Sequence, residues 1–380
     1  MKKILFLTGT RADYGKMKPL MRAVEDSNQF ECYIFVTGMH TLKEFGNTQV
    51  EVLNDGYTNV QIYMNQVIEE PMDLVLANTI NGFGRYIREM VPDLIIIHGD
   101  RIEALAAAVC GAINNILVAH VEGGEVSGTI DESIRHSISK LSHIHFVSNE
   151  RAKSRLQQLG EYTRSIYVIG SPDIDAILNS SSIDFDSVLN HYAISFKDYA
   201  ILMFHPVTTE IDTISDATRK LVDSVLESGD NYIVIHPNND HGYKLILDEY
   251  KRFSGKPNFR VFPSVRFEYF IELLKHANYI IGNSSAGIHE APVVGIPVIN
   301  IGTRQNHRFQ HQGIINCDYS KKSITDSILQ AKSMAPVASI DFFGTGDSRT
   351  CFERIIHSLD FWKTSHQKSF TDLTFLGELL

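Results

Sequence analysis

Short runs of almost wholly apolar residues alternate with longer amphipathic stretches through the first 170 residues of the chain. A run that is apolar on both faces is typical of a parallel strand buried under helices on each side of a sheet. The stretches between them repeat their apolar residues at helical spacing. This half therefore predicts a parallel α/β sheet. Its expected strands are residues 4–7, 32–36, 94–97, 117–121 and 144–147, and its expected helices are residues 15–26, 72–90, 101–114, 131–141 and 149–159.

The alternation stops after residue 172 and starts again near residue 200. The interval 173–195 is polar, contains the run Asn-Ser-Ser-Ser at 179–182, and offers no clear core strand, so we interpret it as a hinge. In the second half we expect strands at 200–204, 232–235, 260–262, 279–281 and 297–301, and helices at 216–228, 243–252, 267–276 and 324–333.

Two such halves predict two Rossmann-like, doubly wound domains with a ligand cleft between them. The expected division is a first domain at 1–172, the hinge at 173–195, a second domain at 196–343, and a C-terminal helix and tail at 344–380, with the helix at 350–361.

The charge and hydropathy of the chain exclude some classes of function. Its 380 residues carry a formal net charge of −10, without the basic surplus of a nucleic-acid binder. The longest apolar runs are too short to span a bilayer, and no signal-peptide pattern opens the sequence. We therefore expect a cytoplasmic protein that binds neither nucleic acid nor membrane.

The turn after the first strand carries an arginine where a dinucleotide-binding turn would carry glycines. The run Thr-Gly-Thr-Arg-Ala-Asp-Tyr-Gly at 8–15 matches neither GxGxxG nor GxxxxGK[ST]. Gly15 still allows close backbone approach, and the Arg11 guanidinium can hold a phosphate through two hydrogen bonds. Arg11 and Gly15 are therefore candidate anion-binding residues, with an ordinary surface arginine as the alternative.

Three carboxylates follow neighbouring strands of the first half. Asp100 and Glu122 come directly after the expected strands 94–97 and 117–121, and Asp131 opens the next helix. Ligands of open parallel sheets bind at the carboxyl ends of strands. Carboxyl groups gathered there raise one another's pKa, which makes acid and base forms available together. We expect a catalytic site here, the alternative being separate solvated loop charges. Arg101 and His136 lie in the same motifs and are further candidates.

The same region also contains residue types that bind metals. His98, Asp100, His120 and Glu122 are all ligand types, in two pairs spaced two residues apart. The pairs fall where strands leave the sheet, so alternate residues need not converge on one point. Neither a HExxH motif nor a cysteine cluster accompanies them. We therefore expect no metal.

The second half offers the opposite wall of the predicted cleft. His205 and Asn238 follow its first and second strands, and Arg304 follows its last. The run Gly-Asn-Ser-Ser-Ala-Gly at 282–287 comes after another strand and can present backbone N–H groups and hydroxyls to a diphosphate. A carboxylate one turn further on suits a ribose diol, although an ordinary capped helix start would look similar. The candidate residues in this second run are Ser284, Ser285, Gly287 and Glu290.

These motifs together resemble the hydrolysing UDP-N-acetylglucosamine 2-epimerases, the first enzymes of bacterial sialic acid synthesis. The resemblance covers nearly the whole chain and is carried by GTRADYGKMKP, VTGMH, HGDRIEA, HVEGGEVSGTIDESIRHSISKLSH, MFHPVTTE, HPNND, PSVRFEYF, GNSSAGIHEAP and INIGTRQNHR. It implies two Rossmann-like domains in the glycosyltransferase-B arrangement, with the active site in the cleft between them. It also implies a homodimer or homotetramer.

The resemblance implies a reaction in two steps and a role for each candidate. UDP leaves by elimination across C1 and C2, and water then adds to the 2-acetamidoglucal to give N-acetylmannosamine. The catalytic positions correspond to Asp100, Glu122, Asp131 and His205, and the UDP-binding positions to Arg11, Asn238, Ser284, Ser285, Glu290 and Arg304. Because a diphosphate is already a good leaving group, no cofactor is implied.

Two positions in the resemblance are informative. Non-hydrolysing relatives usually carry an Arg-Pro-Glu run after the first glycine and threonine, whereas this chain has Arg11-Ala12-Asp13-Tyr14, the hydrolysing pattern. His289 stands where close relatives often have arginine, which removes a permanent charge near the nucleotide.

Three alternatives remain open at this point. The first is the same reaction on UDP-2,4-diacetamido-2,4,6-trideoxyglucose, for legionaminic acid. The second is a glycosyltransferase of the same architecture, in which the three carboxylates would have no joint purpose. The third is a sensor that binds a UDP-sugar without turnover.

Overall fold

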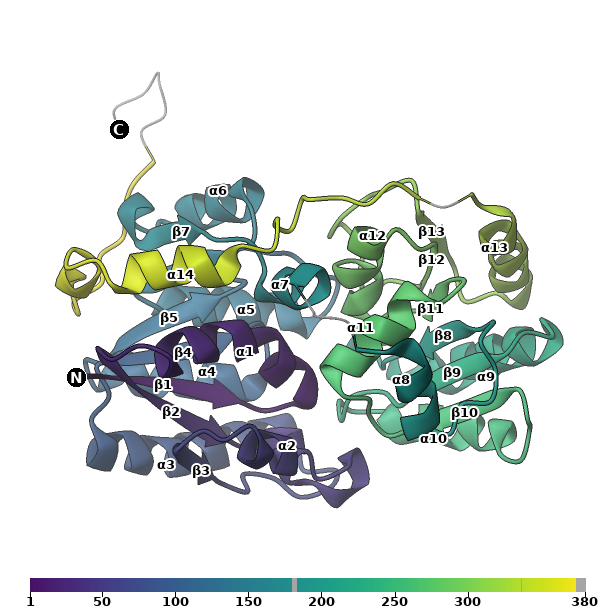
Figure 1. The fold of residues 1–380 in the computed structure, drawn as a ribbon, viewed down its shortest axis with the longest axis horizontal. Coiled ribbons are helices and arrows are strands. Elements are labelled where there is room, and N and C mark those ends of the chain that lie inside the picture. Colours follow the sequence, from purple (N-terminus) through teal and green to yellow (C-terminus); the bar gives the residue numbers. More distant parts are fainter. Residues whose placement is uncertain (180–182, 336, 374–380) are drawn as a thin grey trace.

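The computed structural model describes residues 1–179, 183–335 and 337–373 (Figure 1). Within these residues the strands form two parallel sheets, one of seven strands and one of six. The first has the order β3-β2-β1-β4-β5-β6-β7 and the second β10-β9-β8-β11-β12-β13. The expected pair of doubly wound α/β domains is therefore confirmed. The strands are β1 (Lys2–Thr8), β2 (Phe30–Val36), β3 (Asn59–Ile62), β4 (Leu94–His98), β5 (Leu117–Val121), β6 (Ile144–Val147), β7 (Ile166–Val168), β8 (Ala200–Met203), β9 (Tyr232–Ile235), β10 (Phe259–Phe262), β11 (Ile280–Gly282), β12 (Val298–Ile301) and β13 (Ile314–Cys317).

Helices cover both faces of each sheet (Figure 1). Along β1, Ile4 and Phe6 belong to one apolar cluster, whereas Leu5 and Leu7 belong to another. Because successive side chains of a strand point to opposite faces, both faces of this sheet are buried. The helices are α1 (Arg11–Glu25), α2 (Gln49–Asn54), α3 (Met72–Met90), α4 (Ile102–Ile113), α5 (Ile130–Leu141), α6 (Glu150–Gln158), α7 (Pro172–Asn179), α8 (Phe185–His191), α9 (Ile211–Glu227), α10 (Tyr243–Tyr250), α11 (Phe267–Lys275), α12 (Glu290–Val294), α13 (Lys321–Ser333) and α14 (Ser348–Ile356).

The expected start of the first helix at residue 15 is wrong, because α1 begins at Arg11. The Thr10 side chain accepts a hydrogen bond from the backbone N–H of Asp13 at 3.1 Å, and the Asp13 carboxylate accepts one from the backbone N–H of Thr10 at 2.9 Å. This reciprocal capping box satisfies two backbone donors and starts the helix one turn early. Arg11 is therefore the first residue of a helix and not part of a loop.

The interval expected to be a polar hinge is largely helical in its described part. It contains α7 and α8, and no strand is described there. Ile174 and Ile177 of α7 and Val188 and Leu189 of α8 are buried in an apolar cluster of the second domain. The serine-rich residues 180–182 lie outside the described residues.

The end of the chain returns to the first domain. Helix α14 packs against α1, and Phe352, Ile356 and Phe361 complete an apolar cluster whose other members come from the first sheet and its helices. The chain thus crosses between the domains twice. The crossings touch where the backbone N–H of Ser171 donates to the carbonyl of Phe343 at 2.6 Å. No helix in the described part of the chain is long and apolar enough to cross a membrane.

Candidate active site

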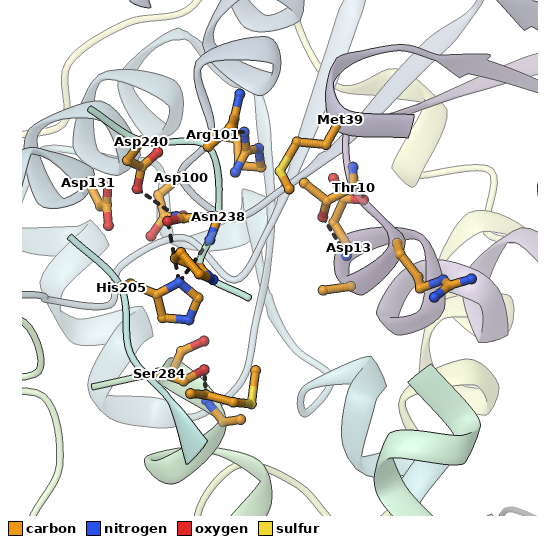
Figure 2. A pocket seen from close by; sticks show the side chains of 18 of the residues that line it. Thr10, Asp13, Met39, Asp100, Arg101, Asp131, His205, Asn238, Asp240 and Ser284 are labelled. Carbon is orange, nitrogen blue, oxygen red and sulfur yellow. Dashed lines mark hydrogen bonds between the residues drawn. The ribbon is translucent and has the colours of Figure 1, made fainter. Parts of the chain in front are cut away.

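A cleft of about 310 Å³ lies between the two domains, at the carboxyl ends of their strands. This is the place where open parallel sheets bind ligands. Figure 2 shows side chains from both domains turned into it. The predicted site residues that line the cleft are Arg11, Asp100, Arg101, Glu122, Asp131, His205, Asn238, Ser284, Ser285, Glu290 and Arg304.

Three candidate residues do not line the cleft. A Cβ atom at Gly15 would lie 2.4 Å from Cβ of Phe267, so this glycine allows α1 and α11 to pack closely. A Cβ at Gly287 would lie 2.8 Å from a methyl group of Val298. His136 lies 3.7 Å from Glu132 on the same helix, α5. The two glycines therefore serve packing, and His136 is outside the cleft.

Arg11 is held between the domains. Its Nη1 atom donates to Oγ of Ser264, in the second domain, at 2.7 Å, and its Nη2 atom contacts the Glu51 carboxylate of the first. Its Nε atom is buried without a hydrogen-bond partner in the described structure. A buried, unsatisfied guanidinium nitrogen is costly, so this donor is available to an anion in the cleft.

Glu122 follows β5 in a left-handed backbone conformation, with φ of +61°. This conformation is uncommon for a residue with a side chain and is found most often at functional sites. One carboxylate oxygen lies 3.0 Å from Nε2 of His98, and the other accepts a hydrogen bond from the Ser171 hydroxyl.

Glu122 and His98 form a charged pair. Burial alone would raise the pKa of Glu122, but His98 outweighs it and, with Lys16, holds that pKa well below its ordinary value. Burial lowers the pKa of His98, but the Glu122 carboxylate outweighs it and the net shift is upward. Both shifts favour the carboxylate beside an imidazolium.

Asp100 is fixed by an arginine from α5. Nη2 of Arg135 contacts its carboxylate, and this guanidinium, followed by those of Arg308 and Arg304, outweighs the effect of burial and lowers the pKa of Asp100. The Nε and Nη1 atoms of Arg135 are buried and without partners in the described structure. Arg135 lines the cleft, so these two donors can serve a substrate.

Asp131 lies in the first turn of the same helix. Thr129 caps that helix, and its hydroxyl accepts from the backbone N–H of Asp131 at 3.3 Å. The Asp131 carboxylate faces the second domain, where Nη2 of Arg304 lies 3.3 Å from its Oδ2 atom. One helix thus carries both Asp131 and the arginine that holds Asp100, which fixes their relative position.

His205 follows β8 on the opposite wall. The backbone N–H of Asn238 donates to its Nδ1 atom at 3.1 Å, so the ring proton resides on Nε2. Burial, and then the positive charge of Arg304, lowers the pKa of His205 to about 3. His205 is therefore a neutral imidazole with one N–H group to donate.

Asn283, which follows β11, holds the backbone of His205. Its Oδ1 atom accepts from the backbone N–H of His205 at 2.6 Å, and its Nδ2 atom donates to the His205 carbonyl at 2.9 Å. Arg304 and Gln305 both donate to the Asn283 carbonyl. The three loops of this wall are therefore cross-linked.

A buried lysine in the wall of the cleft joins the two domains. Nζ of Lys16, on α1, lies 2.9 Å from Asp173 of α7 and 2.9 Å from Glu290 of α12. Glu122, Asp173 and His289 form the one group in the described part of the chain whose ligand atoms could surround a cation. The Lys16 ammonium already supplies positive charge at this point.

His289 is buried behind the cleft and does not line it. Its ring stacks on Phe343 with a centroid separation of 4.2 Å, and Nε2 lies 3.0 Å from the Glu125 carboxylate. Arg308 contacts the same oxygen at 3.0 Å and does line the cleft. Arg308 therefore provides a permanent positive charge close to His289.

Sequence reasoning missed several residues that line the cleft. Asp240, Lys16 and Arg308 line it, yet only their motifs, HPNND, GTRADYGK and GTRQNHR, were singled out. The sequence did indicate the loops that carry them, because each of the three residues lies within five positions of a predicted site residue. The sequence could not tell which side chains of a loop turn inward.

The family model for UDP-N-acetylglucosamine 2-epimerase matches residues 22–360. The chain belongs to the UDP-N-acetylglucosamine 2-epimerase family. It is 48% identical over 376 residues to the UDP-N-acetylglucosamine 2-epimerase of Neisseria meningitidis serogroup B, covering 98% of this chain and 100% of that protein.

Two more distant relatives extend the comparison. The UDP-N,N'-diacetylbacillosamine 2-epimerase (hydrolyzing) of Legionella pneumophila is 32% identical, with 93% of this chain and 95% of that protein covered. Polysialic acid biosynthesis protein P7 of Escherichia coli is 30% identical, and the match covers 86% of this chain and 85% of that protein.

The structure of the Methanocaldococcus jannaschii UDP-GlcNAc 2-epimerase in complex with UDP-GlcNAc and UDP has the same fold. It superimposes with a TM-score of 0.79 at 21% identity, and covers 95% of this chain and 100% of the other. The expected glycosyltransferase-B arrangement is thereby confirmed for this epimerase family member.

Proposed function

We propose that this chain is a hydrolysing UDP-N-acetylglucosamine 2-epimerase, which converts UDP-N-acetylglucosamine and water into N-acetylmannosamine and UDP. The observation that carries the proposal is the cleft in which Asp100, Glu122 and Asp131 of the first domain share a space with His205 and Arg304 of the second. The relative with 48% identity supports the substrate. The name of the Escherichia coli relative supports a place in the synthesis of sialic acid for a surface polysaccharide.

In the first step UDP leaves across C1 and C2, and the cleft has donors for the departing diphosphate. Arg304 and the Nε2–H group of His205 lie on the second-domain wall, beside Ser284 and Ser285. Arg11 adds a guanidinium from the first domain. Fixed donors in a site of low dielectric stabilise developing negative charge more strongly than water does.

One of the carboxylates removes the proton from C2 of the sugar. Glu122 or Asp131 takes this proton as UDP leaves, and the remaining acids stabilise the oxocarbenium-like centre or deliver water. Asp100 stays ionised beside Arg135, which suits an electrostatic role. Glu122 stays ionised beside His98, which suits a base.

Hydrolysis, in preference to release of UDP-N-acetylmannosamine, is supported by the segment Arg11-Ala12-Asp13-Tyr14 and by the Legionella relative whose name includes that activity. Asp13 lines the cleft, but its carboxylate is bound to Thr8 and to the backbone of Gly9 and Thr10. Its contribution is therefore the shape of the turn.

The second candidate is the same reaction on UDP-2,4-diacetamido-2,4,6-trideoxyglucose, for legionaminic acid. The identity of 32% to the Legionella enzyme favours it, whereas the identity of 48% to the Neisseria enzyme favours UDP-N-acetylglucosamine.

One experiment tests both candidates. The protein is incubated with either sugar nucleotide in deuterated water, and the products are followed by NMR. Free N-acetylmannosamine with deuterium at C2, together with UDP, is the expected result from UDP-N-acetylglucosamine. UDP-N-acetylmannosamine as the final product contradicts hydrolysis, and turnover of only the diacetamido sugar favours the second candidate.

The proposal includes a cytoplasmic homodimer or homotetramer. Light scattering on the purified protein measures the oligomeric state, and a monomer contradicts this part of the proposal.

A further inference from the structure

Asp240 brings a carboxyl group into the cleft from the second domain. It lies in the loop between β9 and α10 and lines the cleft. Nδ2 of Asn238 donates to its Oδ2 atom at 2.5 Å, and the backbone N–H of Asn238 donates in turn to His205. Figure 2 shows this chain of hydrogen bonds. Asp240 is thus anchored to the same wall as His205.

The charged groups that face Asp240 come from both domains. Asp131, on α5, repels its ionised form, whereas Arg101, which precedes α4, and Arg304, which follows β12, attract it. Burial raises the pKa of Asp240 most, Asp131 adds to it, and together they outweigh the arginines and the hydrogen bond from Asn238. Asp240 therefore keeps its proton to a higher pH than an ordinary aspartic acid does.

Inversion at C2 requires proton donors and acceptors on two sides of the sugar. The proton that leaves C2 departs from one face of the ring, and the proton that arrives must enter from the other. Asp100, Glu122 and Asp131 all belong to the first domain, so the group that serves the second face belongs on the second-domain wall.

His205 and Asp240 are the two titratable side chains of that wall that are hydrogen-bonded to Asn238, and His205 is unsuited to the task. Its Nδ1 atom already accepts a hydrogen bond, and its low pKa keeps the ring neutral. Donation from Nε2 would leave an imidazolate, which is far too basic to form at neutral pH. A carboxylic acid gives up its proton far more readily than a neutral imidazole does, and the raised pKa of Asp240 favours the protonated form.

We propose that Asp240 is a further catalytic residue, the acid that delivers a proton to C2 of the 2-acetamidoglucal from the second-domain wall. This inference rests on the proposed hydrolytic function. The π electrons of the C1–C2 double bond take the proton of Asp240, and water attacks the oxocarbenium carbon C1. The proton of that water passes to whichever of the Glu122 and Asp131 carboxylates did not take the C2 proton in the elimination. After the product leaves, both of these acids release their protons to solvent and Asp240 is reprotonated.

The test separates hydration from elimination. Asp240→Asn cannot donate a carboxylic proton but keeps the size of the side chain. We expect this variant to release UDP from UDP-N-acetylglucosamine and to accumulate 2-acetamidoglucal. It should hydrate added 2-acetamidoglucal, in the presence of UDP, at least about 100-fold more slowly than the wild type, the usual contribution of a general acid. Asp248→Asn, an exposed change in the same domain, is the matched control.

The pH profile distinguishes a proton donor from a residue that only positions Asn238 and His205. Hydration by the wild type should decline on the basic side as Asp240 loses its proton, and the residual activity of Asp240→Asn should lack that decline. The proposal is contradicted if Asp240→Asn hydrates the glucal more slowly but with the same pH profile as the wild type, or if its hydration rate is normal.

If Asp240→Asn does not fold, Asp240→Glu replaces it. Accumulation of the glucal by that variant supports the proposal, and hydration at the wild-type rate contradicts it.

The products formed by the wild type and by Asp240→Asn distinguish a failure of the hydrolytic function from a failure of the role of Asp240. If the wild type yields UDP-N-acetylmannosamine, the hydrolytic function fails. If the wild type yields N-acetylmannosamine and Asp240→Asn does so at the same rate, only the role of Asp240 fails.

Discussion

The buried contact between Glu122 and His98 makes stability depend on pH from two directions. Glu122 has a lowered pKa, so its contribution is present above its ordinary value of 4.5 and is lost as the pH falls through the lowered value. His98 has a raised pKa, so its contribution is complete below its ordinary value of 6.5 and is lost as the pH rises through the raised value. The pair is therefore intact around pH 6.

We predict that His98→Gln lowers the free energy of unfolding by about 2 kcal/mol at pH 6, the scale of a hydrogen bond to a charged group. At pH 9 the loss should be smaller, because the wild-type imidazole loses its charge as the pH rises through its raised pKa. Urea denaturation at the two pH values measures both losses. His241→Gln, at an exposed position, is the control. A loss that is equal at both values would count against the charged pair.

Asp131 is predicted to act in the reaction and not in nucleotide binding. Asp131→Asn should lower kcat by at least about 100-fold while the Kd for UDP stays within about threefold, because Arg304 remains available to the diphosphate. Steady-state kinetics and calorimetric titration with UDP provide the two values. Asp326→Asn, on the exposed face of α13, should match the wild type. An unchanged kcat would remove Asp131 from the reaction.

At the scale of elements, α1 connects the turn that opens the cleft to the contact between the domains. It packs against α7 and α14 and, at Gly15, against Phe267 of α11. The absence of a side chain at Gly15 therefore sets how closely the second domain approaches the first.

Gly15→Ala should hold the domains apart, because the new Cβ would lie 2.4 Å from Cβ of Phe267. We expect KM for the UDP-sugar to rise about tenfold, since a closed cleft supplies most of the binding contacts. Gly84→Ala is the matched control within a helix, because its Cβ meets nothing closer than 3.5 Å, and it should stabilise the protein by up to about 1 kcal/mol. A KM equal to that of the wild type would show that the contact can relax.

The elements that sequence reasoning found and missed differ in their place in the sheet. Every central strand was predicted from its apolar run, and so was the outer strand β10, whereas the other three outer strands, β3, β7 and β13, were not. An outer strand has one neighbour and keeps polar or exposed positions, as Gln61 and Val168 do, so its pattern is weak. Among the helices, α3 has the bounds 72–90 that the sequence predicted. The start of α1 was predicted four residues too late, because the capping residue Thr10 was not recognised.

The candidate site was predictable to the extent that it depends on strand ends. Asp100, Glu122, Asp131 and His205 all follow strands or open the next helix, and all line the cleft. The cross-domain contacts of Arg11 were not predictable, because they depend on how two separately folded sheets meet. Contacts between two domains produce no periodic pattern of residues that could be recognised in a sequence.

At the scale of the whole molecule, the last helix stabilises the first domain. Phe352 of α14 is fully buried among residues of the first sheet and its helices. Trp362, the one tryptophan in the sequence, lies nearby with its ring 5.9 Å from that of Phe30.

Phe352→Ala should therefore lower the free energy of unfolding by about 4 kcal/mol, the cost of a large cavity in a core. Tryptophan fluorescence during urea denaturation reports on this region directly. Leu359→Ala removes apolar volume at a position that is 81% exposed and should change the unfolding free energy by less than about 0.5 kcal/mol. Equal effects of the two substitutions would contradict the docking of α14.

The contact between Ser171 and Phe343 has a mechanical consequence. Two domains joined by one chain segment can rotate freely, but here two segments cross and are hydrogen-bonded to each other at several points. Beyond the Ser171–Phe343 contact, Asn179 donates to the carbonyl of Gly346, and the backbone N–H groups of Ser348 and Arg349 donate to the Asp175 carboxylate. The paired segments therefore limit how far the two domains can separate. The hydroxyl of Ser171 donates a hydrogen bond to the Glu122 carboxylate, so this candidate catalytic residue is attached directly to one of the two paired segments. We therefore expect Glu122 to be among the cleft residues whose positions change least when the domains move relative to each other.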